Sequence, residues 1–280
     1  MALTPYTEIL SYAKKHKFTV GAFNSFNMES LQALVSAADK KKTPVILQTY
    51  HKHMNFAGAD FMQAISDVAS RHSEIQIGLG LDHGQTYAQA IRCIDAGYSG
   101  VMIDLSSENY DLNVKETKRV VEAAHLRGVS VEAEIGKIFE ANATPEVIAT
   151  GYTDPDMARH FVEETKVDCL AVSVGTAHGF YTYVPKVNFE LIGEILGAVP
   201  CPIVVHGGSY TPDEEVLRMV KMGVAKLNIG TEFFDVYKKT LVDILSNDPG
   251  REVSEVMTVA RTAIEEVALR KLDLLTAYSV

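Results

Sequence analysis

Eight short apolar runs rich in valine and isoleucine alternate with longer segments, and this alternation limits the folds open to the chain. The longer segments carry apolar residues at the spacing of one helix face, as in residues 28–38, 87–96, 114–126 and 213–222. Nearly continuous apolar strands need cover on both faces, which parallel βα units provide. The predicted strands are residues 19–23, 44–48, 75–81, 100–103, 129–134, 168–174, 202–205 and 226–229.

Eight βα units within 280 residues predict a closed (β/α)8 TIM barrel, formed as one domain over residues 1–280. Two further helical segments, 231–245 and 251–274, follow the eighth unit and are expected to pack on the barrel or contact another subunit. An open doubly wound sheet is the alternative. The sequence disfavours it because GAFNSFN follows the first strand, where a dinucleotide-binding fold has G-x-G-x-x-G.

Composition excludes several classes of partner. The net charge is -10, and lysine and arginine are scattered, so we expect neither a nucleic acid nor a membrane partner. No stretch approaches the roughly 18 apolar residues of a spanning helix. Cys93, Cys169 and Cys201 stand in apolar runs without disulfide or metal spacing. We therefore expect a soluble cytoplasmic protein with reduced thiols that acts on a small molecule.

Histidines and acidic residues gather where the predicted strands end. In a barrel these ends form one rim, which carries the chemistry. His83 in LDHG, His178 in GTAHG and His206 in HGGS each stand beside a glycine. One such histidine is ordinarily satisfied by loop backbone, but three with an open fourth position are typical of a catalytic zinc site. The acidic residues predicted to end strands three, four and five are Asp82, Asp104, Glu132 and Glu134.

The six other histidines are weaker candidates. His51 and His53 follow the second strand and lie within reach of the rim. The remaining four fall in helical segments or at their ends and are expected on the surface or in packing: His16, His72, His125 and His160.

Glycine-rich turns follow strands seven and eight. HGGS and NIGT each precede a helix, and backbone N–H groups at a helix N-terminus bind phosphate. Either turn alone is as well explained by ordinary N-capping. Two in adjacent units favour a phosphorylated ligand.

Taken in order, LDHG, MIDLS, VEAEIG, AVSVGTAHG, VVHGGS and KLNIGTE resemble the class II, zinc-dependent ketose-bisphosphate aldolases, which include fructose- and tagatose-bisphosphate aldolases. GAFN near residue 21 and YTDP near residue 152 extend the resemblance over nearly the whole chain. The resemblance implies reversible cleavage of a ketose 1-phosphate or 1,6-bisphosphate to dihydroxyacetone phosphate and an aldehyde. It also implies a Zn²⁺ cofactor and a homodimer or homotetramer.

Carried over by position, the resemblance implies that His83, His178 and His206 bind zinc, with Asp104 and Glu134 as alternate contacts. Asp82 is then the acid/base at the C4 hydroxyl. The implied binding residues for the phosphate are Gly179, Gly207, Gly208, Ser209, Asn228, Ile229, Gly230 and Thr231.

The reaction itself argues for a metal. Aldol cleavage leaves an enediolate whose charge must be stabilised by a cation or drained into an iminium. Lys226 begins the eighth strand and is therefore expected at the opposite end of the barrel from the rim. A Schiff-base lysine is disfavoured, and a zinc Lewis acid is the better account.

Two departures from the family and one unassigned contact leave parts of the site open. Tyr50 stands where the family has the serine of Gln-x-Ser, so the aldehyde half of the substrate is undecided. The family's Gly-Gly-x-Glu-Asp loop, whose glutamate moves the C3 proton, is replaced by KIFEANATPEVIATG; Glu140 is favoured over Glu146 as that base because it is nearer the expected position. The candidates for a distal phosphate ligand from a neighbouring subunit are Arg251, Arg261 and Arg270.

Two other functions fit parts of the pattern. One is a non-catalytic barrel that binds zinc or a sugar phosphate; the other is a zinc phosphoesterase that uses a metal-bound water. Asp82 beside three histidines favours the aldolase, because a degenerate scaffold has no reason to keep this set.

Overall fold

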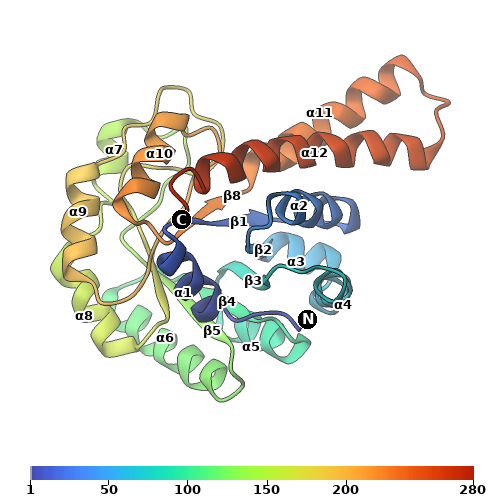
Figure 1. The fold of residues 1–280 in the computed structure, drawn as a ribbon. Coiled ribbons are helices and arrows are strands. Elements are labelled where there is room, and N and C mark those ends of the chain that lie inside the picture. Colours follow the sequence, from blue (N-terminus) through green and yellow to red (C-terminus); the bar gives the residue numbers. More distant parts are fainter. Residues whose placement is uncertain (1) are drawn as a thin grey trace.

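The computed structural model describes residues 2–280, and its strands form a closed parallel barrel in which each strand pairs with the next and β1 pairs with β8 (Figure 1). This confirms the (β/α)8 barrel and excludes the open sheet. The strands are β1 (Val20–Asn24), β2 (Val45–Tyr50), β3 (Ile77–Gly84), β4 (Gly100–Ile103), β5 (Ser130–Ile135), β6 (Cys169–Val172), β7 (Ile203–Val205) and β8 (Lys226–Ile229).

Helices surround the barrel, and two of them, α5 (Tyr87–Ala96) and α10 (Asp213–Met222), begin and end where the sequence predicts. In α5 the Thr86 side chain caps the first turn by accepting from the Gln89 N–H at 3.2 Å, and Gly97 ends the helix at φ +97°. The helices within residues 2–280 are α1 (Tyr6–His16), α2 (Met28–Lys41), α3 (His51–Ala57), α4 (Ala59–Arg71), α5 (Tyr87–Ala96), α6 (Tyr110–His125), α7 (Pro145–Ala149), α8 (Pro155–Thr165), α9 (Phe189–Ala198), α10 (Asp213–Met222), α11 (Thr231–Asn247) and α12 (Val253–Leu275).

Strand side chains divide into an outer set beneath the helices and an inner set that fills the barrel. Leu47 and Val101 pack in the outer cluster, whereas their neighbours Ile46 and Met102 pack in the inner one. This is the two-residue alternation of a strand. Towards the carboxyl ends of the strands, buried polar residues replace the apolar ones: Asn24, Asp82, Glu134, His206 and Asn228.

A tyrosine from α1 fills the barrel beneath this polar layer. Tyr6 is completely buried. A Cβ atom added at Gly80 would lie 1.4 Å from the Tyr6 hydroxyl, and one at Gly100 would lie 2.4 Å from its ring. Both glycines are therefore required, because a larger side chain at either would occupy the space of the ring.

The two C-terminal helices confirm the predicted extension. α11 and α12 form an antiparallel pair that projects from the barrel (Figure 1), and α12 also packs along α2. Val242 and Val253 on this arm are 66% and 68% exposed. None of the helices within residues 2–280 combines the length and apolar character that crossing a lipid bilayer requires.

Candidate active site

The adjacent residues Asp82 and His83 both reach the barrel mouth because β3 is irregular at its end. On a regular strand their side chains would point to opposite faces. The pairing of β3 with β4 shifts register between Leu81 and Gly84, and His83 adopts φ +49°. A Cβ at Gly84 would lie 2.5 Å from the Met102 carbonyl oxygen, so the bulge requires glycine there. As a result the carboxylate and the imidazole line one cavity.

The structure brings together the three histidines singled out in the sequence. His83 comes from β3, and His178 and His206 from the loops after β6 and β7. One ring nitrogen of each lies within 4.8 Å of those of the other two. The ring centroid of His83 is 4.8 Å from that of His178 and 4.7 Å from that of His206.

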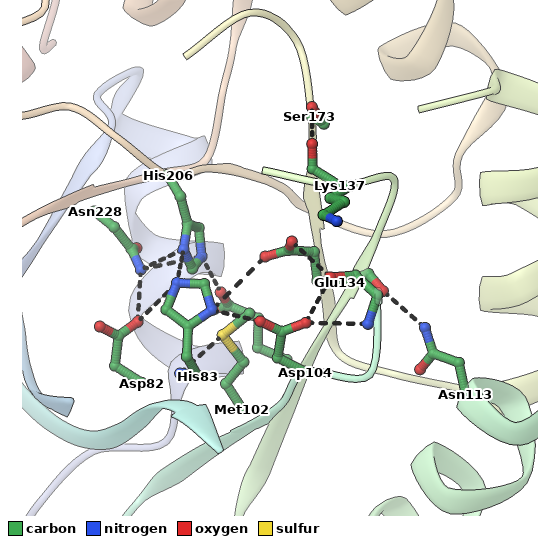
Figure 2. A network of polar contacts seen from close by, with 12 residues as sticks. Asp82, His83, Met102, Asp104, Asn113, Glu134, Lys137, Ser173, His206 and Asn228 are labelled. Carbon is green, nitrogen blue, oxygen red and sulfur yellow. Dashed lines mark hydrogen bonds and ion pairs between the residues drawn. The ribbon is translucent and has the colours of Figure 1, made fainter. Parts of the chain in front are cut away.

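Two carboxylates orient two of these rings. His83 Nδ1 lies 2.6 Å from Asp104 Oδ2, and His206 Nε2 lies 2.9 Å from Glu132 Oε1. When each N–H donates to its carboxylate, His83 Nε2 and His206 Nδ1 face one another 2.9 Å apart (Figure 2). A metal-binding histidine shows this arrangement, with a carboxylate on the nitrogen away from the metal.

The charges in the cluster fit one bound cation. Burial by itself lowers the pKa of His83, but Asp82 and Asp104 outweigh it and raise that pKa to about 10. Burial and the charge on His83 lower the pKa of His178 to about 4 and that of His206 well below its usual value. Without metal, the three rings therefore hold one positive charge, a proton on His83. The donor set suits zinc, which would take the place of that proton.

Glu134 offers a second set of ligands together with His83 and Asp104. Its Oε1 accepts from Ser106 Oγ at 3.0 Å, whereas Oε2 is buried and has no hydrogen-bond partner within the described chain. Burial and the neighbouring Asp104 raise the pKa of Glu134 well above its usual value. A buried carboxylate oxygen without a hydrogen-bond partner, 3.9 Å from His83 Nδ1, is a suitable alternate contact for a cation.

Asp82 is held as a carboxylate beside the histidines. Its oxygens accept from Asn24 Nδ2 at 2.7 Å and from Asn228 Nδ2 at 3.2 Å. Burial by itself raises the pKa of Asp82, but the charge on His83 and the hydrogen bond from Asn24 help to outweigh it and leave that pKa below its usual value. The group is therefore ionised at neutral pH and lines the cavity, so it can accept a proton there.

The cavity has a volume of about 400 Å³ and includes most of the predicted phosphate site. Ser209 Oγ accepts from the Gly230 and Glu232 N–H groups at 3.1 and 3.3 Å, at the N-terminus of α11. The predicted phosphate-site residues that line the cavity are Gly179, Gly207, Ser209, Asn228, Gly230 and Thr231.

Two predicted phosphate ligands lie outside this lining. The Gly208 N–H already donates to the Asn228 carbonyl at 2.9 Å. Ile229 is completely buried in the outer cluster.

The loop after β5 brings Glu140 over the site. The His178 N–H donates to the Phe139 carbonyl at 2.9 Å, and the Ala141 N–H donates to the His178 carbonyl at 2.7 Å. Glu140 consequently lines the cavity, and a Cβ at Gly179 would lie 3.5 Å from its Oε2. Glu146 lies in the first turn of α7 and lines a separate cavity of about 580 Å³.

The other residues that line the cavity were weak candidates in the sequence analysis or were not proposed there. Tyr50 and His51 reach the cavity, whereas the ring of His53 packs near Phe26 and Phe234. Of the residues that sequence reasoning missed, Asn24 and Ser106 had a signal, as the last residues of GAFN and MIDLS. The missed lining residues are Asn24, Gln85, Ser106, Ser107, Lys137, Ile138 and Phe234.

The three candidate arginines do not line the cavity of this chain. Arg251 Nε lies 3.2 Å from Glu255 Oε2, and Arg261 donates to Gln32 Oε1 at 3.1 Å. Arg270 is exposed on α12.

Two predicted positions were wrong. Glu132 does not end a strand at the rim but lies within β5, completely buried. Lys226 begins β8, yet its side chain is not at the far end of the barrel, because Nζ lies 2.7 Å from both Glu132 Oε2 and Asn228 Oδ1. A lysine side chain is long enough to span two layers of the interior. Its amino group is nevertheless completely buried and paired, which still argues against a Schiff base.

Comparisons with known proteins show the family to which the chain belongs. The family model described as fructose-bisphosphate aldolase class-II matches residues 4–279. The fructose-bisphosphate aldolase of Geobacillus stearothermophilus is 34% identical over 279 residues, covering 97% of this chain and 96% of its own. The sulfofructosephosphate aldolase of Alkalicoccus urumqiensis is 34% identical over 251 residues, covering 89% and 88%.

A solved structure shows the same fold. The crystal structure of the YdjI aldolase from Escherichia coli K12 superposes with a TM-score of 0.86 at 28% identity, covering 98% of this chain and 97% of the other. Sequence, fold and site therefore agree. The chain belongs to the class-II fructose-bisphosphate aldolase family and is a class II aldolase, a carbon–carbon lyase.

Proposed function

We propose that this aldolase uses zinc to cleave a ketose 1-phosphate or ketose 1,6-bisphosphate reversibly to dihydroxyacetone phosphate and an aldehyde. The observation that carries the proposal is the position of three imidazoles beside an ionised Asp82, in one cavity with an α11 N-terminus. His83, His178 and His206 would hold the ion, with Asp104 and Glu134 as alternate contacts. When bound, zinc supplies positive charge to the oxygens of the three-carbon fragment as negative charge develops there.

The protein's own groups move the protons and hold the phosphate. Asp82, fixed by Asn24 and Asn228, removes the proton of the C4 hydroxyl as the C3–C4 bond breaks. Glu140, which lines the same cavity, delivers a proton to C3 of the three-carbon fragment after the C3–C4 bond has broken. The phosphate binds beside Gly179, Gly207, Ser209, Gly230 and Thr231, where the N-terminus of α11 and the dipole of that helix favour an anion.

The distal end of the substrate meets a different set of residues. The two relatives named above carry names of ketose phosphates that differ in the distal group. Among the lysines and arginines of residues 2–280, Lys137 alone lines the cavity. We assign to Lys137 the recognition of an anionic distal group on the aldehyde half.

The deciding experiment incubates the zinc-loaded protein with a panel of ketose 1-phosphates and 1,6-bisphosphates and quantifies dihydroxyacetone phosphate against free phosphate. We expect dihydroxyacetone phosphate and an aldehyde in equal amounts, lost on chelation and restored by zinc. Release of free phosphate instead would identify a phosphoesterase. Absence of turnover on the whole panel, with zinc bound, would support a binding protein.

We also propose that the chain forms a homodimer or homotetramer in the cytoplasm. The projecting α11–α12 arm with its exposed valines supports self-association, and three free cysteines suit a reducing compartment. Light scattering over a hundredfold range of concentration tests the assembly, and a constant monomer mass would contradict it.

A further inference from the structure

We propose that Lys226 is a positioning residue that orients the proposed zinc ligand His206 and the proposed acid/base Asp82 from a single buried ammonium group. The inference rests on the proposed function, since it assigns a support to residues of that same site. Lys226 and Glu132 are both 0% exposed. Neither group reaches the cavity, so neither contacts the substrate.

The first contact path runs through Glu132 to the metal site. Lys226 Nζ donates to Glu132 Oε2 at 2.7 Å, and the other oxygen of the same carboxylate accepts from His206 Nε2 at 2.9 Å. Because Nε2 is then the protonated nitrogen, His206 presents the lone pair of Nδ1 towards His83. Carboxylates that hold a ligating histidine in this way typically contribute about 10–100-fold to metal affinity.

The second path runs through Asn228 to Asp82. The amide oxygen of Asn228 accepts from Lys226 Nζ at 2.7 Å, and its amide nitrogen donates to Asp82 Oδ1 at 3.2 Å (Figure 2 shows Asn228 between His206 and Asp82). An amide has one acceptor end and one donor end. The ammonium group therefore holds the oxygen end, and the nitrogen end faces both Asp82 and the His206 ring, whose Nδ1 lies 3.3 Å from Asn228 Nδ2. If the amide turned over, its oxygen would face the carboxylate and the donor would be lost.

Stability alone does not explain the pair. Residues of the inner cluster around it are apolar, including Met102, Ala171 and Val204. A buried ion pair contributes little net stability compared with a well-packed apolar pair of similar volume. Instead, the carboxylate of the pair contacts the proposed metal ligand His206, and its ammonium group contacts Asn228, the amide that holds Asp82.

Lys226→Met tests the two paths together. We expect zinc affinity, measured by competition with a chromophoric chelator, to fall about tenfold or more. We expect kcat to fall at least about tenfold while KM changes little, because the substrate-contacting groups remain. Val204→Ala is the control: it removes apolar volume from the same cluster and should lower the melting temperature without changing zinc affinity or kcat.

The double variant Lys226→Met with Glu132→Gln separates the paths. Glutamine keeps a carbonyl oxygen that accepts from His206 Nε2, and it leaves no uncompensated buried charge. Zinc affinity should return to within about threefold of the native value. The value of kcat should stay low, because Asn228 still lacks its donor.

Native zinc affinity and native kcat in Lys226→Met would overturn the proposal, as would recovery of both properties in the double variant. If Lys226→Met does not fold, the double variant decides alone, and failure of both to fold would assign the pair to stability and also overturn the proposal. Zinc competition needs no turnover. An inactive wild-type protein would therefore refute the proposed function. The zinc affinities of the single and double variants would still test the path from Lys226 through Glu132 to His206.

Discussion

The floor and the walls of the cavity are held in different ways. The floor consists of side chains at strand ends, such as Asp82, His206 and Asn228, which are buried and each bonded to other side chains. The walls are the loops after β5 and β6, where Lys137 and Glu140 are exposed. Those loops are joined to each other mainly by backbone bonds between Phe139, Ala141 and His178.

This difference separates two kinds of function. Groups on strands keep their geometry because register and hydrogen bonds hold them, which suits metal binding and proton transfer common to all substrates. Groups on loops tolerate sequence change, which suits substrate selection and a base whose position has shifted from the family's pattern. Changes to the floor, and to the proposed metal ligand His178 on the loop after β6, should abolish the reaction for every substrate. Changes to Lys137 or Glu140 should affect one class of substrate or one half-reaction.

The largest effect should follow removal of a metal ligand from the floor. His83→Asn is the sharpest variant, because asparagine tolerates the positive φ of this position and the backbone strain is unchanged. Loss of a direct ligand should weaken zinc binding by more than about 100-fold, beyond the range of an outer partner. Metal analysis after dialysis against chelator, with cleavage assays over the whole panel, measures it. Native zinc content with full activity would remove His83 from the metal site.

Asp82→Asn should come next. It keeps the shape of the side chain and removes the proton acceptor, so kcat should fall about 10²–10⁴-fold for every substrate while zinc stays bound. Rapid-quench cleavage assays and metal analysis of the same sample provide the two values. Cleavage at the native rate would assign the proton transfer to another residue.

A smaller and selective effect is expected at the wall. Glu140→Gln should slow exchange of the C3 proton of dihydroxyacetone phosphate with solvent deuterium by about 10²-fold, as followed by NMR. Glu146→Gln is the matched control, since Glu146 lines the other cavity and should exchange at the native rate. Unchanged exchange in both variants would show that the loop carries no catalytic base and would weaken the division between floor and walls.

The smallest effect is expected for Lys137→Met. KM should rise about tenfold for substrates with an anionic distal group, as expected for one charged hydrogen bond at an exposed position, and the rise should shrink at high salt. Substrates with an uncharged distal end should keep their KM within about twofold. Equal changes for both classes of substrate would contradict a role of Lys137 in selecting the distal group.

The sequence predicted the fold and most of the cavity because both follow from local periodicity. The two-residue period of the strands and the 3.6-residue period of the helices identify parallel βα units, and a closed barrel places all eight strand ends at one rim. His83, His178 and His206 could therefore be grouped before their distances were known. Glu132 was misplaced because strand ends are the least certain feature of such a prediction.

What the tertiary structure alone decided depends on residues far apart in the chain. The bulge against β4 turns Asp82 and His83 to the same side, and the glycines facing Tyr6 admit a ring from α1 into the barrel. The sequence favoured Glu140 by its position, and the pairing of Phe139 and Ala141 with His178 places it at the cavity, whereas Glu146 lines another. Lys226 reaches Glu132 across the interior for the same reason. Periodicity predicts which face of a strand or helix a side chain occupies. Which group a long side chain contacts, and which backbone segments pair, depends on residues that only folding brings close.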